Sequence, residues 1–342
     1  MSMFTSLLLK LQRREDLSVE ESTAAMAEIM DGRAASSQIA ALLVGLSMKG
    51  ERPSEIVGLA RAMRERATPL PLEAGLEVFD TCGTGGDGAD TFNVSTAAAL
   101  VVAACGVRFA KHGNRSVSSR CGSADVFEEL GVKIDAAPEV TARCLEQAGI
   151  GFLFAPAFHP SMRHAGPTRK ELGVRTAFHL LGPLTNPARP ARQLVGVPRP
   201  ELTELVARSL AMLGTTRAWV VHGADGLDEL STTGYSKVSE YRDGAVNTFY
   251  IHPAEFGLPR AEPGALRGGD AAVNAGVVRA ILDGAPGAPR DIVLYNAGAS
   301  LLIAGRAETL SEGITQAAQA IDSGRARGVL DRLARVSQDA AA

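Results

Sequence analysis

The chain has 342 residues, of which 46% are hydrophobic, enough to bury one large core or a large core with a smaller companion. Lysine and arginine number 35 against 38 aspartates and glutamates, so the net charge of −3 provides no field that would gather nucleic acid or an anionic membrane. No apolar run reaches the roughly 20 residues of a membrane span, and no signal-peptide core is present, so we expect no nucleic-acid partner and no membrane insertion.

The four cysteines form no C-x-x-C pair and follow no zinc-like spacing. In a chain of this length such spacing indicates reduced thiols, and reduced thiols are typical of the cytoplasm. We therefore expect a cytoplasmic protein.

The first 66 residues have a helical pattern. Ser18 and Glu21 form a capping-box sequence, Gly32 can end that helix, and Ser36 can cap the next one, which Gly50 would stop. Pro53 suits the first turn of a third helix. Each helix carries one apolar stripe, so the three should pack on one another or on a partner chain.

The pattern changes after Thr68-Pro69-Leu70-Pro71, where two prolines favour extended backbone and predict a linker. Short strand-like runs then alternate with helical runs, and residues 242–245 read as a hairpin turn. Such alternation predicts an α/β domain with a central, mostly parallel sheet flanked by helices, and ligands at the carboxyl ends of its strands. The predicted strands include 78–79, 107–110, 151–154 and 219–221, and the predicted helices include 93–104, 138–148 and 200–213.

A glycine-rich loop, residues 83–88, follows the first predicted strand. Its exposed N–H groups could wrap a phosphate. It satisfies G-x-G-x-x-G, but three residues intervene before the helix and no acid lies about 20 residues on, so a dinucleotide site is disfavoured. No Gly-Lys-Ser/Thr ends the loop, which disfavours a Walker motif. A tight turn without a ligand stays open on this motif alone.

Two further segments repeat this phosphate-binding chemistry. Asn93-Val94-Ser95-Thr96 opens a long apolar helix, and Asn93 is expected to cap it. Free N–H groups and the helix dipole favour a phosphate there, and a hydroxyl could ligate Mg²⁺. Lys111 to Ser119 follows the next strand with two cations, a histidine, an amide and three hydroxyls, and Ser123 begins another helix. Together these segments predict one site for a ligand that carries both a phosphate and a pyrophosphate.

These motifs also carry a family resemblance. GTGGD, NVST, KHGNRSVSS and GSADVFEELGV, in this order and at these separations, resemble the anthranilate phosphoribosyltransferase family. The resemblance continues through residues 152–188, 222–234 and 296–305 and spans nearly the whole chain. It implies the transfer of a phosphoribosyl group from phosphoribosyl pyrophosphate (PRPP) to the amine of anthranilate, a step of tryptophan biosynthesis.

The resemblance also implies the site residues. The metal site, for two Mg²⁺ ions, would use Ser95 with the acidic pair Asp228-Glu229, and the acceptor site would use Gly83, Asn114 and Arg169, with His112 and His159 as weaker candidates. The PRPP site would comprise Gly83, Gly86, Asp87, Thr91, Asn93, Val94, Ser95, Thr96, Lys111, His112, Gly113, Asn114, Arg115, Ser116, Val117, Ser118, Ser119 and Ser123. No catalytic acid–base dyad is implied, since positioning and electrostatics suffice for an amine that is already nucleophilic.

The family resemblance further implies a homodimer joined through a small helical domain. That domain comprises residues 1–70 and is joined by a returning segment near 170–185, beside an α/β domain over 76–342. The sequence departs from the family pattern at Phe158, His179, Cys121 and Tyr235-Ser236, which bear on the acceptor pocket and on a loop near the metals.

Two other functions stay open at this point. A pyrimidine nucleoside phosphorylase would have a similar fold, but the HGNR loop and the acidic pair at 228–229 disfavour it. A non-catalytic binding protein on the same fold, perhaps for nucleic acid, predicts lost carboxylates and a basic surface, and neither is found.

Overall fold

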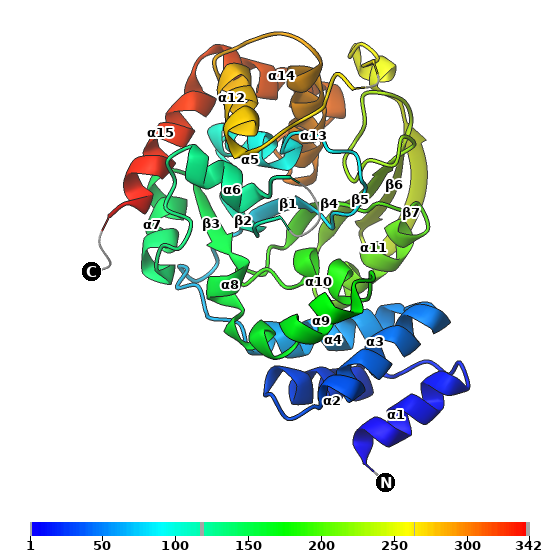
Figure 1. Cartoon of the computed structure of the whole chain (residues 1–342). Helices are drawn as coiled ribbons and strands as arrows, with labels where there is room; N and C mark the ends of the chain where they lie inside the picture. The colour runs from blue at the N-terminus through cyan, green and yellow to red at the C-terminus, as the bar shows by residue number, and fades with distance from the viewer. Residues whose placement is uncertain (1, 117–119, 263, 340–342) are drawn as a thin grey trace.

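The computed structural model describes residues 2–116, 120–262 and 264–339, and it has two parts (Figure 1). A helical part at the N-terminus lies below a larger α/β part, and the chain crosses between them near residues 66–78. The helical part contains α1 (Met3–Gln12), α2 (Val19–Met30), α3 (Ser36–Lys49) and α4 (Pro53–Glu65). No helix in the described ranges is long and apolar enough to span a membrane.

Local signals explain where these helices begin and end. At α2 the Glu21 amide donates to Ser18 Oγ at 3.1 Å and the Ser18 amide donates to Glu21 Oε2 at 2.9 Å, which confirms the capping box. Gly50, with φ +87°, ends α3. Ser36 is the first residue of α3 and not its cap, which is Ala35. The structure also adds α1, which the sequence pattern did not separate.

A seven-stranded sheet forms the centre of the larger part, in the order β3-β2-β1-β4-β5-β6-β7. The first five strands in this order are parallel, and β6 and β7 add an antiparallel edge, so the predicted fold class is confirmed. The strands are β1 (Phe79–Gly83), β2 (Phe109–Gly113), β3 (Ile150–Phe154), β4 (Arg192–Gly196), β5 (Arg217–Gly223), β6 (Ser236–Arg242) and β7 (Ala245–Ile251).

The predicted hairpin turn at 242–245 joins β6 to β7. Asp243 and Gly244 both have positive φ, 51° and 84°, as a two-residue turn with the twist of the strands requires. Several strands differ from the sequence expectation. β1 was predicted over residues 78–79 and spans Phe79–Gly83. β2 begins two residues later than predicted and continues to Gly113, and β4, which pairs with β1 along its whole length, was not predicted.

Helices cover both faces of this sheet (Figure 1). They comprise α5 (Val94–Ala104), α6 (Ser123–Glu129), α7 (Pro138–Gln147), α8 (Ala155–Phe158), α9 (Gly166–Leu172), α10 (Phe178–Leu184), α11 (Leu202–Met212), α12 (Ala271–Leu282), α13 (Ala288–Ile303), α14 (Leu310–Asp322) and α15 (Arg325–Ser337), with short 3-10 helices at Pro160–His164 and Pro253–Phe256.

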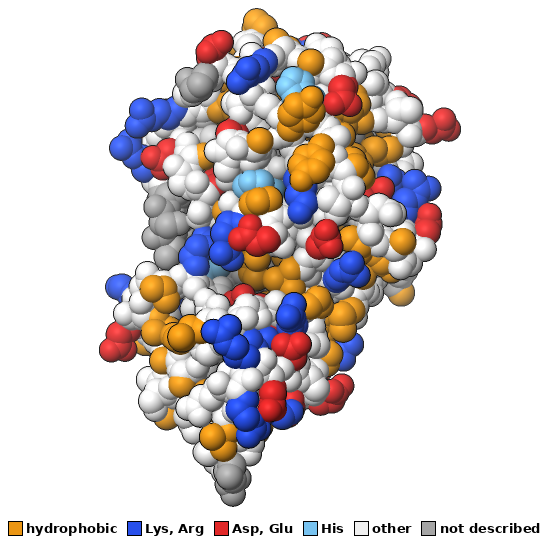
Figure 2. All heavy atoms as spheres, turned by 90° about the vertical axis from the view of Figure 1, so that its right-hand side faces the viewer, with side chains coloured by type: hydrophobic (Ala, Val, Ile, Leu, Met, Phe, Trp, Pro, Cys, Tyr) orange, Lys and Arg blue, Asp and Glu red, His pale blue; other side chains and the backbone are white. Residues whose placement is uncertain are grey.

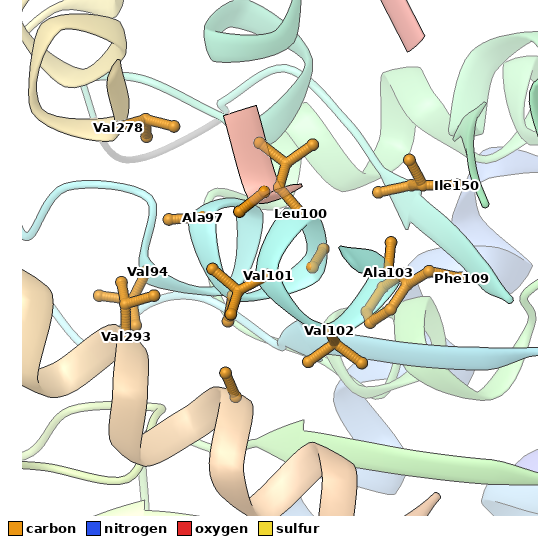
Figure 3. Packing of buried hydrophobic residues seen from close by; sticks show 14 of the residues in the cluster. Val94, Ala97, Leu100, Val101, Val102, Ala103, Phe109, Ile150, Val278 and Val293 are labelled. Atoms are coloured by element: carbon orange, nitrogen blue, oxygen red, sulfur yellow. The ribbon is translucent and has the colours of Figure 1, made fainter. Parts of the chain in front are cut away.

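The main core surrounds α5, in which Val94 and every residue from Thr96 to Ala103 are buried. Figure 3 shows α5 with Val278 of α12, Val293 of α13 and Ile150 of β3 around it, all members of the same buried cluster. A helix that is apolar on every side needs neighbours on every side, and here it finds them. This packing fixes the N-terminus of α5 at the edge of the sheet.

A second core joins the two parts of the chain. It contains buried residues of α2, α3 and α4 together with Phe178 and Leu181 of α10, Leu210 of α11, and Val220 of β5. Because successive residues of a strand face opposite sides, Trp219 and Val221 of β5 lie in the first core instead. The helical part therefore packs on one face of the sheet through α10 and α11.

Candidate functional site

The site lies where the parallel strands end. The register pairs Gly83 of β1 with Gly196 of β4, and Gly113 of β2 with Phe154 of β3, so the carboxyl ends of four strands meet at one edge. The glycine-rich loop leaves this edge directly after β1, with φ of +69° at Gly85 and +79° at Gly86. Only glycine adopts such values without strain, which explains the composition of the loop.

The acidic pair, five residues after β5, reaches the same edge. The Gly85 amide donates to Asp228 Oδ2 at 2.7 Å, and the Asp228 amide lies 3.5 Å from Asp87 Oδ2. A Cβ on Gly83 would collide with the Asp228 carboxylate, and a Cβ on Gly196 would collide with the Asp228 backbone. Glycine at both strand ends is thus what lets the loop after β5 approach the sheet.

Both carboxylates of the pair are buried, with 9% of Asp228 and 7% of Glu229 exposed. Burial, and then the nearby Asp87 charge, raise the pKa of Asp228 to about 7. Burial and the Asp228 charge raise the pKa of Glu229 well above its usual range. The protein therefore concentrates acidic groups whose charged forms a bound cation would stabilise.

Lys111 is a positively charged side chain of the protein near these acids. Its side chain is buried, with 1% exposed. The Lys111 Nζ donates to the Thr81 carbonyl at 2.6 Å and lies 3.4 Å from Ser95 Oγ. Next to Thr81, the buried Asp80 accepts a 2.9 Å hydrogen bond from Asn186, and burial raises its pKa to about 6. Lys111 lowers that pKa in part, so one buried ammonium lies among several acids.

The helix N-terminus at α5 differs in detail from the expectation. Asn93 occupies the cap position, but its side chain does not cap the helix. Its Oδ1 accepts from Asn274 at 2.9 Å and its Nδ2 donates to the Cys121 carbonyl at 3.3 Å. Other groups accept from the first-turn N–H groups of α5: the Val94 amide donates to the Phe92 carbonyl at 2.8 Å and the Thr96 amide donates to the Asn93 carbonyl at 3.1 Å. The Ser95 amide donates to the Glu229 carboxylate, which places this acid at the N-terminus of α5.

The remaining predicted residues of this segment have different exposures. Ser95 is partly exposed beside Lys111, while Val94 and Thr96 are buried and Thr96 Oγ1 has no partner among the described residues. Of these three residues, Ser95 is the one that can offer a side-chain group, its hydroxyl, to a ligand. Thr91 lies earlier in the loop, in an isolated bridge with Arg267.

The segment after β2 closes the site on its other side. Arg115 is exposed and paired with Asp125 and Glu128 of α6, each at 2.8 Å, and Ser123 Oγ lies 3.5 Å from the Asn114 carbonyl. The Ser116 amide donates to Asp125 Oδ2 at 3.3 Å. Val117, Ser118 and Ser119 lie outside the described residues.

The proposed acceptor residues come from different elements. Arg169, on α9, lies over the Phe178 ring at 4.8 Å, and burial lowers its pKa. The His112 and His159 rings lie 5.1 Å apart, and burial lowers their pKa values to about 3 and about 4, so both are neutral at pH 7. His112 Nδ1 lies 3.2 Å from the Gly182 carbonyl. The structure records no contact between Arg169 and Asn114.

Two residues near the site were not singled out by the sequence analysis. Arg175 approaches Thr84 of the glycine-rich loop, and in the sequence it is one of four basic residues between positions 163 and 175. Asn274, from α12, holds Asn93 across 181 residues of chain. A polar residue whose partner is so distant in sequence leaves no local signal.

The donor set fits Mg²⁺ bound together with a polyphosphate. Among the described residues, no three His, Cys, Asp or Glu side chains gather into a closed metal cage. Mg²⁺ usually takes one or two carboxylates and completes its octahedron with water and substrate phosphates. Asp228, Glu229 and the Ser95 hydroxyl match that open kind of site, and a bound cation would favour the charged forms of the two buried acids.

Lysine and arginine side chains also gather near the junction of the two parts, on the face drawn in Figure 2. A cavity of about 470 Å³ opens at this junction and is lined by Arg52, Arg175, Arg199 and Arg208 together with Glu51 and His179. Arg175 thus borders this cavity and also contacts the glycine-rich loop.

Comparison with known proteins gives full-length matches. Residues 75–327 match the family model "Glycosyl transferase family, a/b domain" and residues 5–67 match "Glycosyl transferase family, helical bundle domain". Anthranilate phosphoribosyltransferase 2 of Streptomyces coelicolor is 54% identical over 94% of this chain and 96% of its own. The anthranilate phosphoribosyltransferase of Desulfatibacillum aliphaticivorans is 50% identical over 98% of this chain and 99% of its own.

Solved structures agree with this picture. The anthranilate phosphoribosyltransferase of Thermus thermophilus superposes with a TM-score of 0.92 at 45% identity, covering 97% of this chain and 99% of that one. The Saccharomyces cerevisiae enzyme in complex with PRPP and Mg superposes with a TM-score of 0.88 at 26% identity, covering 98% and 97%.

Proposed function

The chain belongs to the anthranilate phosphoribosyltransferase family, and we propose that it carries out that family's reaction with the residues at the carboxyl edge of its sheet. The reaction moves the phosphoribosyl group of PRPP to the amine of anthranilate and gives N-(5-phosphoribosyl)anthranilate and pyrophosphate. The observation that carries the proposal is the convergence of a glycine-rich loop, the buried Lys111 and the buried pair Asp228-Glu229 at one edge.

The chemistry sets the tasks of these residues. The bond from the anomeric carbon to the pyrophosphate oxygen breaks, its electron pair leaves on that oxygen, and the anthranilate nitrogen forms the new bond and loses a proton to water. The growing negative charge needs preorganised donors more than a general base. The loop amides and Lys111 supply those donors and that cation.

We propose Ser95, Asp228 and Glu229 as the ligands of Mg²⁺. We propose that two Mg²⁺ ions bind, as the family resemblance implies. When bound there, the metal would neutralise the pyrophosphate oxygens. The structure of the yeast relative in complex with PRPP and Mg supports this use of the metal. The PRPP site is proposed to comprise residues 83, 86, 87, 91, 93–96, 111–119 and 123.

We propose Arg169, with Gly83 and Asn114, for the acceptor. The planar guanidinium can bind a carboxylate through two parallel hydrogen bonds, and the ring of Phe178 holds it in place. A structure of the yeast relative in complex with 4-fluoroanthranilate supports an aromatic carboxylate as acceptor.

Residues 1–70, with the returning segment near 170–185, are proposed as a helical domain beside an α/β domain over 76–342. The contacts of α9 with α3 and of α10 with α4 support this division. A cytoplasmic homodimer through the helical domain is proposed as well, and the exposed Met48 on α3 supports such an interface. Sedimentation equilibrium would show a monomer if the dimer is wrong.

The test of function follows the loss of anthranilate fluorescence on mixing with PRPP and Mg²⁺. The double variant Asp228→Asn with Glu229→Gln keeps shape but removes charge, so turnover should fall on the order of 100-fold or more. Both acids are buried with raised pKa values, so neutral amides should leave the thermal midpoint intact.

Asp243→Asn, in the exposed turn between β6 and β7, is the matched control and should turn over normally. Wild-type rates that do not change across a magnesium titration would reject the metal assignment. No loss of fluorescence in the wild type would reject the function.

A further inference from the structure

Arg175 lies on the short segment between α9 and α10, and its side chain packs on the glycine-rich loop. Its Nη2 lies 3.5 Å from the Thr84 carbonyl, at the outer limit of a hydrogen bond. A Cβ on Gly86 would collide with Arg175 Nη1, so the guanidinium occupies the space that any side chain at position 86 would need. The missing side chain at Gly86 is what lets this cation reach the loop backbone.

The charges around Arg175 are incompletely matched. Asp87 and Asp228 attract its charge and Arg199 repels it, but no described carboxylate oxygen lies within the 4.0 Å of an ion pair. The side chain is also accessible to solvent, and it borders the 470 Å³ cavity. A guanidinium that has no ion-pair partner and is accessible to solvent can turn toward an anion at the loop.

We propose that Arg175 contacts the pyrophosphate of PRPP and stabilises it as the leaving group. The inference rests on the proposed function, because it places the pyrophosphate at the loop of residues 83–88. When the bond to the anomeric carbon breaks, the electron pair goes to the pyrophosphate oxygen, and a guanidinium fork can bind two phosphate oxygens at once. Lys111 is anchored to Thr81 within β1 and Arg175 to Thr84 in the loop, so the two cations would reach the pyrophosphate from different elements.

This position also links the acceptor side to the donor side. Arg175 lies six residues after Arg169 on the same returning segment, which packs on the helical part through α9 and α10. The segment that carries the proposed carboxylate contact therefore also carries a contact to the leaving group.

Isothermal calorimetry with inorganic pyrophosphate and Mg²⁺ tests the inference without turnover. Arg175→Gln should weaken pyrophosphate binding roughly tenfold or more, since a charged hydrogen-bonded contact is lost. Arg175→Lys keeps the charge but not the fork, so its affinity should lie between those of wild type and Arg175→Gln. Arg208→Gln, which lines the same cavity and lies 3.7 Å from Glu204, is the control and should bind as wild type does.

Steady-state kinetics separate this role from a structural one. Arg175→Gln should raise the KM for PRPP or lower kcat, and leave the KM for anthranilate within about twofold of wild type. Unchanged pyrophosphate affinity in Arg175→Gln, a rise only in the KM for anthranilate, or no pyrophosphate binding by wild type would overturn the inference. If Arg175→Gln does not fold, the lysine variant decides: reduced affinity supports the contact and wild-type affinity rejects it.

Failure of the proposed function has a different signature. A wild-type protein that binds pyrophosphate through Arg175 but does not consume anthranilate would reject the reaction and retain the contact. A protein that consumes anthranilate equally well with Gln at 175 would retain the reaction and reject the contact.

Discussion

Four basic residues, Arg163, Arg169, Lys170 and Arg175, follow one another closely in sequence, and only their surroundings tell them apart. Arg163 and Lys170 are exposed, whereas Arg169 is partly buried over the Phe178 ring. Its Nε has no hydrogen-bond partner among the described residues. A guanidinium with an unpaired, buried N–H group favours binding of a carboxylate, because this N–H group already lost its water when the protein folded.

We therefore expect Arg169→Ala to raise the KM for anthranilate roughly ten- to hundredfold, since a charged bidentate contact contributes about 1.5–3 kcal/mol. The KM for PRPP should stay close to that of wild type. Aniline, which lacks the carboxylate, should be a poor acceptor for wild type and should discriminate little between wild type and variant.

The neighbouring Lys170→Ala provides the control and should leave both constants unchanged. Equal damage to PRPP binding in Arg169→Ala would instead mark Arg169 as a structural residue. The anthranilate carboxylate would then need another partner, and His112 with Asn114 are the next candidates.

At the scale of elements, the helices α2 and α4 approach each other closely. Gly58 of α4 lies against the first turn of α2, where an added Cβ would be 2.6 Å from Ser22 Cβ and would also collide with the Val19 carbonyl. Thr23 Oγ1 donates to the Gly58 carbonyl at 3.2 Å. The two backbones touch because this position has no side chain.

Gly58→Ala should therefore lower the free energy of unfolding by about 1–3 kcal/mol through overpacking, despite the better helix propensity of alanine. Gly276→Ala is the matched variant, because Gly276 is exposed on α12 and nothing lies within 4 Å of its added Cβ. It should stabilise the protein by up to ~1 kcal/mol. Denaturant titration measures both; equal and small effects would contradict the close approach of α2 and α4.

At the scale of the whole molecule, the helical part and the α/β part share the second core. Leu59 of α4 is 1% exposed and belongs to this core, as does Val220 of β5. Trp219, the single tryptophan, is the neighbour of Val220 on the same strand and faces the first core. A substitution that destabilises the helical part should therefore also destabilise the sheet.

We expect Leu59→Ala to lower the stability by about 2–5 kcal/mol, and to shift the unfolding midpoint seen by Trp219 fluorescence together with that seen by far-UV circular dichroism. Val273→Ala, on the exposed surface of α12, should move neither midpoint appreciably. A tryptophan transition that stays in place while the helical signal shifts would show that the two parts unfold independently.

The sequence alone determined the fold class, the capping box at Ser18 and the hairpin turn at Asp243-Gly244, because local rules of capping and backbone conformation act over a few residues. It also located the glycine-rich loop, since the resemblance and the loop composition agree. It missed β4, a short strand whose position is set by pairing with β1 more than 100 residues earlier in the chain.

Only the tertiary structure decided which side chains meet at the strand ends. The Gly85 amide and Asp228 are 143 residues apart in sequence, and Asn93 and Asn274 are 181 apart, so no periodicity could join them. Burial likewise depends on the assembled packing: it raises the pKa of Asp228 to about 7. The same packing directs the Asn93 side chain away from the helix it was expected to cap. Arg175 differs from its basic neighbours only because the fold brings it onto a loop residue that lies 91 positions earlier.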